Sequence, residues 1–295
     1  MESGPTQGND KAPIAVVMIT LNEGHNMDGV LQNIKDWAQE IFLIDSYSSD
    51  ATVDIALEHG AHVVQRKFSG FGDQWNFALR ELPISAPWTM KLDPDERFSE
   101  DLKANISSAI DRDSADGLSL TRRLWFMQQP LPVRQTLIRV WRTGSCEFTD
   151  VSVNEHPIIK GSIEFIEGEL EHHDSPNLHH WVEKQNKYSS MEAISRMKGA
   201  GLAAAPRLLG NTLERRMWLK KHWRKIPLRY RLYAVKCVLD AKPWLSGHAG
   251  MSWARSRVWV RRLIEEKLIE LQKGAEMPNI EAKLGDPHPH ARQAD

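Results

Sequence analysis

A repeated pairing of short apolar runs with amphipathic stretches constrains the fold of this chain more than any other feature. Short apolar runs without alternation suit strands that are covered on both faces. Strands that alternate with helices over short connections predict a parallel sheet with helices on its two faces. We expect strands at 14–19, 41–45, 62–64 and 90–92. We expect the intervening helices at about 26–38, 51–59 and 73–82.

The pattern changes beyond about Gly117, where extended segments follow one another without long helices between them. These segments lie at 118–121, 136–141 and 162–171, and they favour mixed or antiparallel pairing. From Leu178 the chain has helical character almost to Lys273. The predicted fold class is therefore α/β, with a mixed, mainly parallel sheet flanked by helices and a C-terminal helical extension. The predicted division is a flexible tail at 1–12, a sheet domain at 13–177, a helical extension at 178–273 and a flexible tail at 274–295.

Composition restricts the class of protein and its compartment. The chain has 295 residues, of which 41% are hydrophobic and 26% charged, as is usual for a soluble globular protein. Its two cysteines, Cys146 and Cys237, lie far apart and predict free thiols in a reducing compartment. The sequence has neither a run of 18 apolar residues nor the apolar core of a signal peptide. We therefore expect a cytoplasmic location.

The clearest chemical signal follows the fourth apolar run, where Leu92 leads into Asp93, Asp95 and Glu96. Carboxylate oxygens are the ligands of hard divalent cations, and Mg²⁺ usually bridges one or two carboxylates to substrate phosphates. In open α/β sheets, ligands bind outside the carboxyl ends of the strands. The sequence thus indicates a cation site here, and the alternative is a solvated acidic turn.

Three further polar segments lie at the carboxyl ends of strands or the amino ends of helices, where backbone N–H groups favour anions. They are Thr20-Leu21-Asn22-Glu23, Asp45-Ser46-Tyr47-Ser48 and Gly70-Phe71-Gly72-Asp73-Gln74-Trp75-Asn76. With the Asp-x-Asp pair that follows, this set resembles the family 2 glycosyltransferases, which have the GT-A fold. It is most similar to the subgroup that adds sugars to the lipopolysaccharide inner core, which includes β-1,4-glucosyltransferases. The resemblance covers about residues 13–190.

The resemblance implies a nucleotide-sugar donor and the residues that bind it. Thr20 and Glu23 match the loop that contacts the nucleotide. Asp45 matches the acid that accepts hydrogen bonds from the base, and a UDP-sugar is the first expectation. Gln74 and Asn76 match the start of a helix that lines the donor pocket. Solvent-facing amides are the alternative for these two residues.

The resemblance also implies Mg²⁺ or Mn²⁺ as cofactor. Asp93 and Asp95 match the motif that binds the metal and the sugar diphosphate, with Asp95 as the direct ligand. A single histidine is common further along in the family, and here His172 and His173 are adjacent, so both are candidates. Lys184 matches a helix lysine that can neutralise phosphate charge, and a solvated helix position is its alternative.

Inverting transfer needs a base, because the acceptor hydroxyl loses a proton as it attacks the anomeric carbon. The resemblance implies Glu155 for this role, and Asp150 is the second candidate. Asn154 stands where the relatives have histidine. The alternative is that Glu155 is an ordinary loop acid.

Positive charge is concentrated in the helical extension. Between Arg207 and Arg262 there are 15 lysines and arginines against two acids, together with five of the 11 tryptophans. Basic helices that carry tryptophan are typical of segments that bind an anionic membrane surface. A packed helical subdomain with solvated charges is the second interpretation, and nucleic acid is the least favoured partner.

The sequence therefore predicts metal-assisted, inverting transfer of a sugar from a UDP-sugar. The expected acceptor is a saccharide of the lipopolysaccharide core or a lipid-linked glycan, at the inner face of the cytoplasmic membrane. One alternative is a non-catalytic nucleotide-binding scaffold of a membrane assembly. Another is a Mg²⁺-dependent nucleotidyltransferase, which normally has a Gly-rich loop with a basic residue after the first strand. The segment Thr20-Leu21-Asn22-Glu23-Gly24 lacks that pattern.

Overall fold

The computed structural model describes residues 11–149, 156–198 and 204–276. Strands and helices alternate in its first half, as the sequence predicts. The elements are β1 (Ala12–Thr20), α1 (Gly24–Ile34), β2 (Ala38–Asp45), α2 (Thr52–Glu58), β3 (His62–Gln65), α3 (Phe71–Glu81) and β4 (Trp88–Lys91). The sheet part continues with β5 (Glu96–Phe98), α4 (Glu100–Arg112), β6 (Gly117–Phe126), β7 (Gln129–Arg142), β8 (Cys146–Phe148), β9 (Pro157–Ile159) and β10 (Ile163–His173).

Eight of these strands form one sheet in the order β3-β2-β1-β4-β7-β6-β10-β5. Strands β1 to β4 are mutually parallel, β7 is antiparallel to both β4 and β6, and β10 is parallel to β6. Thr20 pairs with Asp45, so the carboxyl ends of β1 and β2 meet at the same edge, with the end of β4 beside them. The mixed, mainly parallel sheet predicted from the sequence is confirmed.

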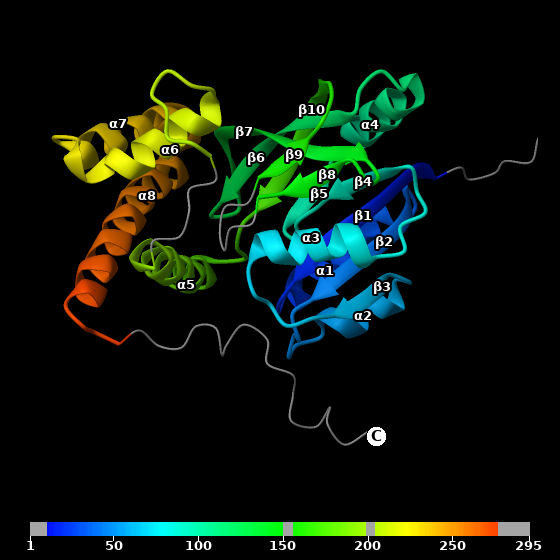
Figure 1. Cartoon of the computed structure of the whole chain (residues 1–295), viewed down its shortest axis with the longest axis horizontal. Helices are drawn as coiled ribbons and strands as arrows, with labels where there is room; N and C mark the ends of the chain where they lie inside the picture. The colour runs from blue at the N-terminus through cyan, green and yellow to red at the C-terminus, as the bar shows by residue number, and fades with distance from the viewer. Residues whose placement is uncertain (1–10, 150–155, 199–203, 277–295) are drawn as a thin grey trace, which may run out of the picture.

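Both faces of the sheet are covered, because successive side chains on a strand point to opposite faces. On β1, Ile14 and Val16 enter one core together with residues of α1, α2 and α4. Ala15 and Val17 enter a second core with α3 and with β8, which pairs with β9 in a small ribbon. Helices therefore lie on either side of the sheet (Figure 1).

Some local predictions differ from the structure. The helix expected at 26–38 ends at Ile34, and β2 already begins at Ala38. Trp37 continues the apolar spacing of the helix but lies in the turn, where its indole N–H donates to Ser107 Oγ (3.0 Å). The sequence analysis did not anticipate β5 or α4, although Ser99 caps α4 by accepting from the backbone N–H of Leu102.

The C-terminal part is helical, as predicted, with α5 (Leu178–Met197), α6 (Thr212–His222), a short 3-10 turn at Trp223–Lys225, α7 (Arg229–Ala241) and α8 (Pro243–Gln272). Figure 1 shows α6, α7 and α8 at one side of the sheet and α4 at the opposite side. A third core joins the helices to the β6–β7 hairpin and contains Phe126, Leu131, Trp181, Cys237 and Trp253. The helical part is thus packed onto the sheet part. None of the described helices is long and apolar enough to cross a membrane.

Candidate active site and cation site

The acidic turn after β4 meets the end of β10 at one edge of the sheet. Strand β10 runs antiparallel to β5, and His172 pairs with Glu96 in the register of these strands. The backbone N–H of His173 donates to the carbonyl of Asp95 (2.8 Å). This pairing brings the His172 side chain to the Asp95 carboxylate, with 3.3 Å between His172 Nε2 and Asp95 Oδ2.

Asp95, His172 and Asp174 form a cluster suited to a divalent cation. Each offers one ligand atom, and these atoms all lie within 4.8 Å of one another. Asp95 Oδ1 is buried and accepts no hydrogen bond from the described residues. A buried carboxylate oxygen without a partner is costly. A cation bound by oxygen and nitrogen ligands removes that cost, so these residues fit Mg²⁺ or Mn²⁺.

Lys184, on α5, is the positive group of this cluster. Its Nζ lies 3.1 Å from Asp95 Oδ2 and 3.0 Å from both Asp174 Oδ1 and the Asp174 carbonyl oxygen. Burial alone lowers the pKa of Lys184, but Asp95 and Asp174 raise it well above its usual range. Burial alone raises the pKa of Asp95, but His172 and Lys184 hold it well below its usual range. Both groups are therefore charged at neutral pH.

Asp93 lies outside the cation cluster. Its Oδ2 accepts a hydrogen bond from the Arg139 guanidinium (2.9 Å), and its backbone N–H donates to Glu96 Oε2 (3.0 Å). Burial raises the pKa of Asp93, but Arg139 and Lys91 hold it below its usual range. Glu96 is fully buried and pairs with Arg139 and Arg122. The turn therefore directs Asp95 to the cluster and Asp93 to arginine, so the predicted pair of metal ligands is divided.

His173 also lies outside the cluster, because neighbouring residues on a strand face opposite sides. Its ring stacks on Trp125, with 4.5 Å between the ring centroids, and its Nε2 lies 3.1 Å from Glu171 Oε2. Of the two adjacent histidines that the sequence left open, the structure brings His172 into the cluster. Asp174, one residue further on, was missed. The sequence could have indicated Asp174, because alternate residues of a strand share a face and Asp174 is two residues after His172.

Asp45 and Thr20 join the ends of the first two strands. Asp45 is fully buried and accepts hydrogen bonds from Thr20 Oγ1 (3.1 Å), the backbone N–H of Ser48 (2.9 Å) and Gln65 Nε2 (3.0 Å). A carboxylate has about four acceptor positions, so most of those on Asp45 are already used within the protein. Its contact with a nucleotide base stays a prediction.

Glu23 lies in the loop after β1 and belongs to the same electrostatic environment as the cluster. Its carboxylate accepts from Asn26 Nδ2 (2.8 Å), and its backbone N–H donates to Thr52 Oγ1 (2.9 Å). Burial and the nearby Asp95 carboxylate raise the pKa of Glu23 to about 7. The sequence predicted that Glu23 lies at the site, but it gave no sign that its pKa is raised.

The two amides at the start of α3 have different surroundings. Gln74 is buried, and its Oε1 accepts from Arg66 (2.6 Å) while its Nε2 approaches Ser46 Oγ (3.4 Å). Asn76 forms two hydrogen bonds with the backbone of Phe148, accepting from its N–H (2.8 Å) and donating to its carbonyl (3.0 Å). Asn76 therefore ties α3 to β8, and its predicted role in the donor pocket stays a prediction. Glu155 and Asp150, the candidate bases, lie outside the described residues.

Comparison with known proteins shows the family to which the chain belongs. The family model described as Glycosyl transferase family 2 matches residues 15–163, half of the chain. An uncharacterized glycosyltransferase of Rickettsia bellii is 34% identical over 93 residues, which are 32% of this chain but only 31% of that protein. One of Rickettsia prowazekii is 26% identical over 202 residues, 63% of this chain and 68% of that protein. The crystal structure of S. aureus TarS 1–349 is 14% identical, with a TM-score of 0.44, and the match covers 90% of this chain and 93% of that one.

The matched segment contains the parallel strands β1 to β4, the acidic turn and most of the antiparallel addition. This agreement confirms the GT-A type of fold and the assignment as a glycosyltransferase. Because the model matches half of the chain, the protein belongs to family 2 of the glycosyltransferases.

Proposed function

We propose that this glycosyltransferase moves a sugar from a nucleotide-diphosphate sugar, with a UDP-sugar as first choice, to a saccharide acceptor with inversion. The observation that carries the proposal is the cluster of Asp95, His172 and Asp174, together with the unpartnered Asp95 Oδ1. A divalent cation bound there supplies charge that offsets the negative charge building up on the leaving diphosphate.

The protein's own residues prepare the cluster for a diphosphate. Lys184 holds Asp95 and Asp174 together and adds a positive charge beside them. Burial and the Asp95 carboxylate raise the pKa of Glu23 to about 7, and in its protonated form Glu23 can donate a hydrogen bond to an anion. Asp45 keeps the loops after β1 and β2 together at the same edge of the sheet.

We also propose a base, an acceptor and a location, which rest on the sequence. Glu155 is the proposed base, and a turnover comparison of Glu155→Gln with Asp150→Asn tests that choice. The proposed acceptor is a saccharide of the lipopolysaccharide core or a lipid-linked glycan, at the inner face of the cytoplasmic membrane. The excess of basic residues between Arg207 and Arg262 supports this location. Family membership favours transfer over a scaffold or a nucleotidyltransferase.

A screen of nucleotide sugars tests the proposal. Wild-type protein is incubated with each donor and Mn²⁺ or Mg²⁺, and hydrolysis or transfer is followed. We expect turnover of one donor class, its loss in excess chelator, and its loss in Asp95→Ala, whose cooperative thermal unfolding shows that the fold is retained although Lys184 has lost one counter-charge. Asp36→Ala, which removes an exposed acid on the turn after α1, is the control and should keep full activity. Full turnover in excess chelator overturns the proposal.

A further inference from the structure

The tryptophans of the helical part divide into packed and exposed side chains. Trp253 is buried in the third core, and Trp223 packs against Tyr230 and Tyr233. Trp244 and Trp259 are 65% and 43% exposed. If the basic, tryptophan-bearing segment binds a membrane, the surface that does so is the face of α7 and α8 that carries exposed apolar side chains.

An apolar stripe runs along the outer side of α7. Leu232, Val235 and Leu239 are 57–59% exposed, and their spacing of three and four residues places them on one face of the helix. Trp244 and Leu245, at the start of α8, extend the exposed apolar surface. Contiguous exposed apolar side chains mark an interaction or membrane surface rather than an ordinary solvated face.

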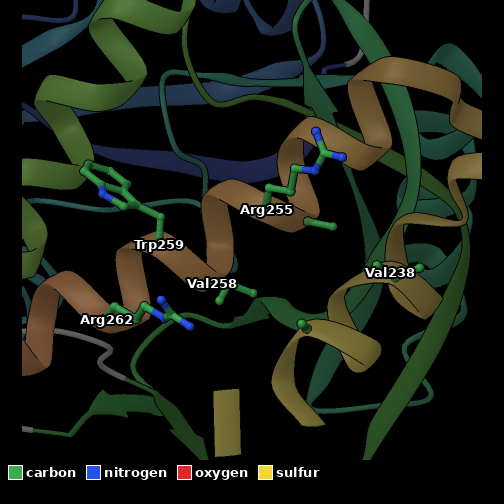
Figure 2. A pocket seen from close by; sticks show the side chains of 7 residues that line it. Val238, Arg255, Val258, Trp259 and Arg262 are labelled. Carbon is green, nitrogen blue, oxygen red and sulfur yellow. The ribbon is translucent and has the colours of Figure 1, made fainter. Parts of the chain in front are cut away.

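A cavity of about 350 Å³ opens between α7 and α8, lined by a different set of α7 side chains. Its walls are apolar, and two arginines of α8 belong to its lining (Figure 2). Figure 2 shows Val258 on the α8 segment between Arg255 and Arg262, with Val238 on the neighbouring α7. The lining consists of Ala234, Val238, Ala254, Arg255, Val258, Trp259 and Arg262. An apolar slot with guanidinium groups beside it matches a ligand that has both a hydrocarbon chain and an anionic group.

The two arginines that line the cavity are in no ion pair with an acid of the described residues, whereas Arg229 of α7 pairs with Glu265 of α8. Asp240 is the only acid in α7 and in α8 as far as Arg262, and it is paired with Lys236. Within the described part of the chain, the side chain of Arg255 forms neither an ion pair nor a hydrogen bond. The Arg262 guanidinium lies over the Tyr230 ring, 5.0 Å from its centroid. Both arginines therefore remain available to an anion.

We propose that the α7–α8 face is a docking surface for anionic phospholipid in a bilayer. One acyl chain enters the cavity, Arg255 and Arg262 contact lipid phosphates, and Leu232, Val235, Leu239 and Trp244 rest in the interfacial layer. Nucleic acid fits this face less well, because exposed aliphatic side chains gain nothing from a phosphate backbone. A second copy of the chain would bring the same positive charge and be repelled. The inference deepens the membrane location in the proposed function, and its test needs no sugar donor.

Cosedimentation with vesicles tests the surface directly. Vesicles of phosphatidylcholine alone are compared with vesicles in which roughly a third of the lipid is phosphatidylglycerol, whose charge attracts basic segments. We expect binding to the anionic vesicles only, weakening as salt rises because ions screen the attraction. Arg255→Glu, at a side chain without a recorded polar partner, and Arg255→Glu/Arg262→Glu should lower apparent affinity by about tenfold or more, since each charge near the surface matters.

Two further variants separate lipid insertion from charge attraction. Leu239→Ser shortens the exposed stripe, and Ala234→Phe fills the cavity, while neither changes the net charge. Both should reduce binding several-fold, whereas simple electrostatic attraction leaves them unaffected. The matched control is Lys35→Glu/Arg80→Glu, which reverses two exposed charges, one in the turn after α1 and one on α3, and should bind within about twofold of wild type.

Thermal unfolding confirms that each variant is folded before its binding is compared. Equal binding to neutral and anionic vesicles, or binding unchanged by Arg255→Glu, overturns the inference. Tighter binding to DNA than to anionic vesicles does so as well. A dimer that forms as the protein concentration rises and is abolished by Leu239→Ser would also overturn the inference. The vesicle assay contains no nucleotide sugar, so its result is independent of the proposed reaction. A protein that binds vesicles but transfers no sugar would refute the proposed reaction and still support the docking surface.

Discussion

When no metal is bound, Lys184 supplies positive charge that offsets the negative charge of Asp95 and Asp174. Its ammonium group contacts the same two carboxylates, Asp95 and Asp174, that are proposed to hold the divalent cation. The ammonium and the cation therefore compete for these oxygens, and their positive charges repel each other. The structure predicts that a metal ion must displace or share this contact when it binds.

We expect Lys184→Met to bind Mn²⁺ about tenfold more tightly than wild type in the absence of nucleotide, a change of ~1.4 kcal/mol. The metal-free variant should unfold at a lower temperature, because two buried carboxylates lose their counter-charge, and Mn²⁺ should restore its stability. Calorimetric titration and thermal unfolding measure the two effects. Lys187→Met, on the same helix but outside these ion pairs, is the control. Unchanged or weaker Mn²⁺ affinity in Lys184→Met contradicts the competition.

The raised pKa of Glu23 makes the stability of the folded protein fall as the pH rises. Burial and Asp95 raise its pKa from 4.5 to about 7, so the folded state keeps a proton that the unfolded state has released. Stability from this proton is fully present below pH 4.5 and is lost as the pH rises through about 7.

The free energy of unfolding of wild type relative to Glu23→Gln should therefore fall by on the order of 1–3 kcal/mol between about pH 5 and about pH 8. Urea unfolding in chelator, so that no metal changes the charge at the cluster, measures the difference. A parallel pH dependence in the two proteins shows that Glu23 titrates normally.

At the scale of secondary structure, Asn76 at the start of α3 has a clear role in holding the fold together. Asn76 is hydrogen-bonded twice to the backbone of Phe148, and Phe148 packs in the second core with Trp75. The helix and the β8–β9 ribbon are thereby fixed to each other.

Asn76→Ala should lower the free energy of unfolding by about 1–3 kcal/mol, because two backbone groups lose their partners. We expect the dissociation constant for the nucleotide to stay within about threefold of wild type, less than 1 kcal/mol. Urea unfolding and nucleotide titration test the two statements together. A large loss of nucleotide affinity with unchanged stability would return Asn76 to the donor pocket.

Elements with a local signal were predictable from the sequence, whereas those that depend on long-range pairing were not. The run Met90-Lys91-Leu92 ends in acids, so a site after β4 followed from adjacent residues alone. The contribution of Asp174 depends on β10 lying beside β5, two strands more than 60 residues apart in the sequence. The helix boundary near Trp37 was misjudged, because an apolar residue in a turn has the same spacing as one on a helix.

At the scale of the whole molecule, the sheet and the helical part share a core, and both contribute residues to the candidate site. Trp181 of α5 packs with Phe126 and Leu131 of the β6–β7 hairpin, while Lys184, one turn further along α5, reaches the cation cluster. The sequence correctly predicted a helical region from residue 178, but its composition alone did not show that the region completes the site. Helices α7 and α8, which carry the exposed apolar side chains, lie on the opposite side of the sheet from α4 (Figure 1).

The central claim is that a divalent cation at Asp95, His172 and Asp174 holds the diphosphate of the donor. Calorimetric titration of UDP into the wild-type protein, in Mn²⁺ and again in excess chelator, tests it most directly. We predict binding in Mn²⁺ that weakens at least about tenfold in chelator, a loss of ~1.4 kcal/mol or more, and a comparably weak affinity for Asp95→Ala under both conditions. Equal UDP affinity with and without the metal, in wild type and in Asp95→Ala alike, would contradict the claim.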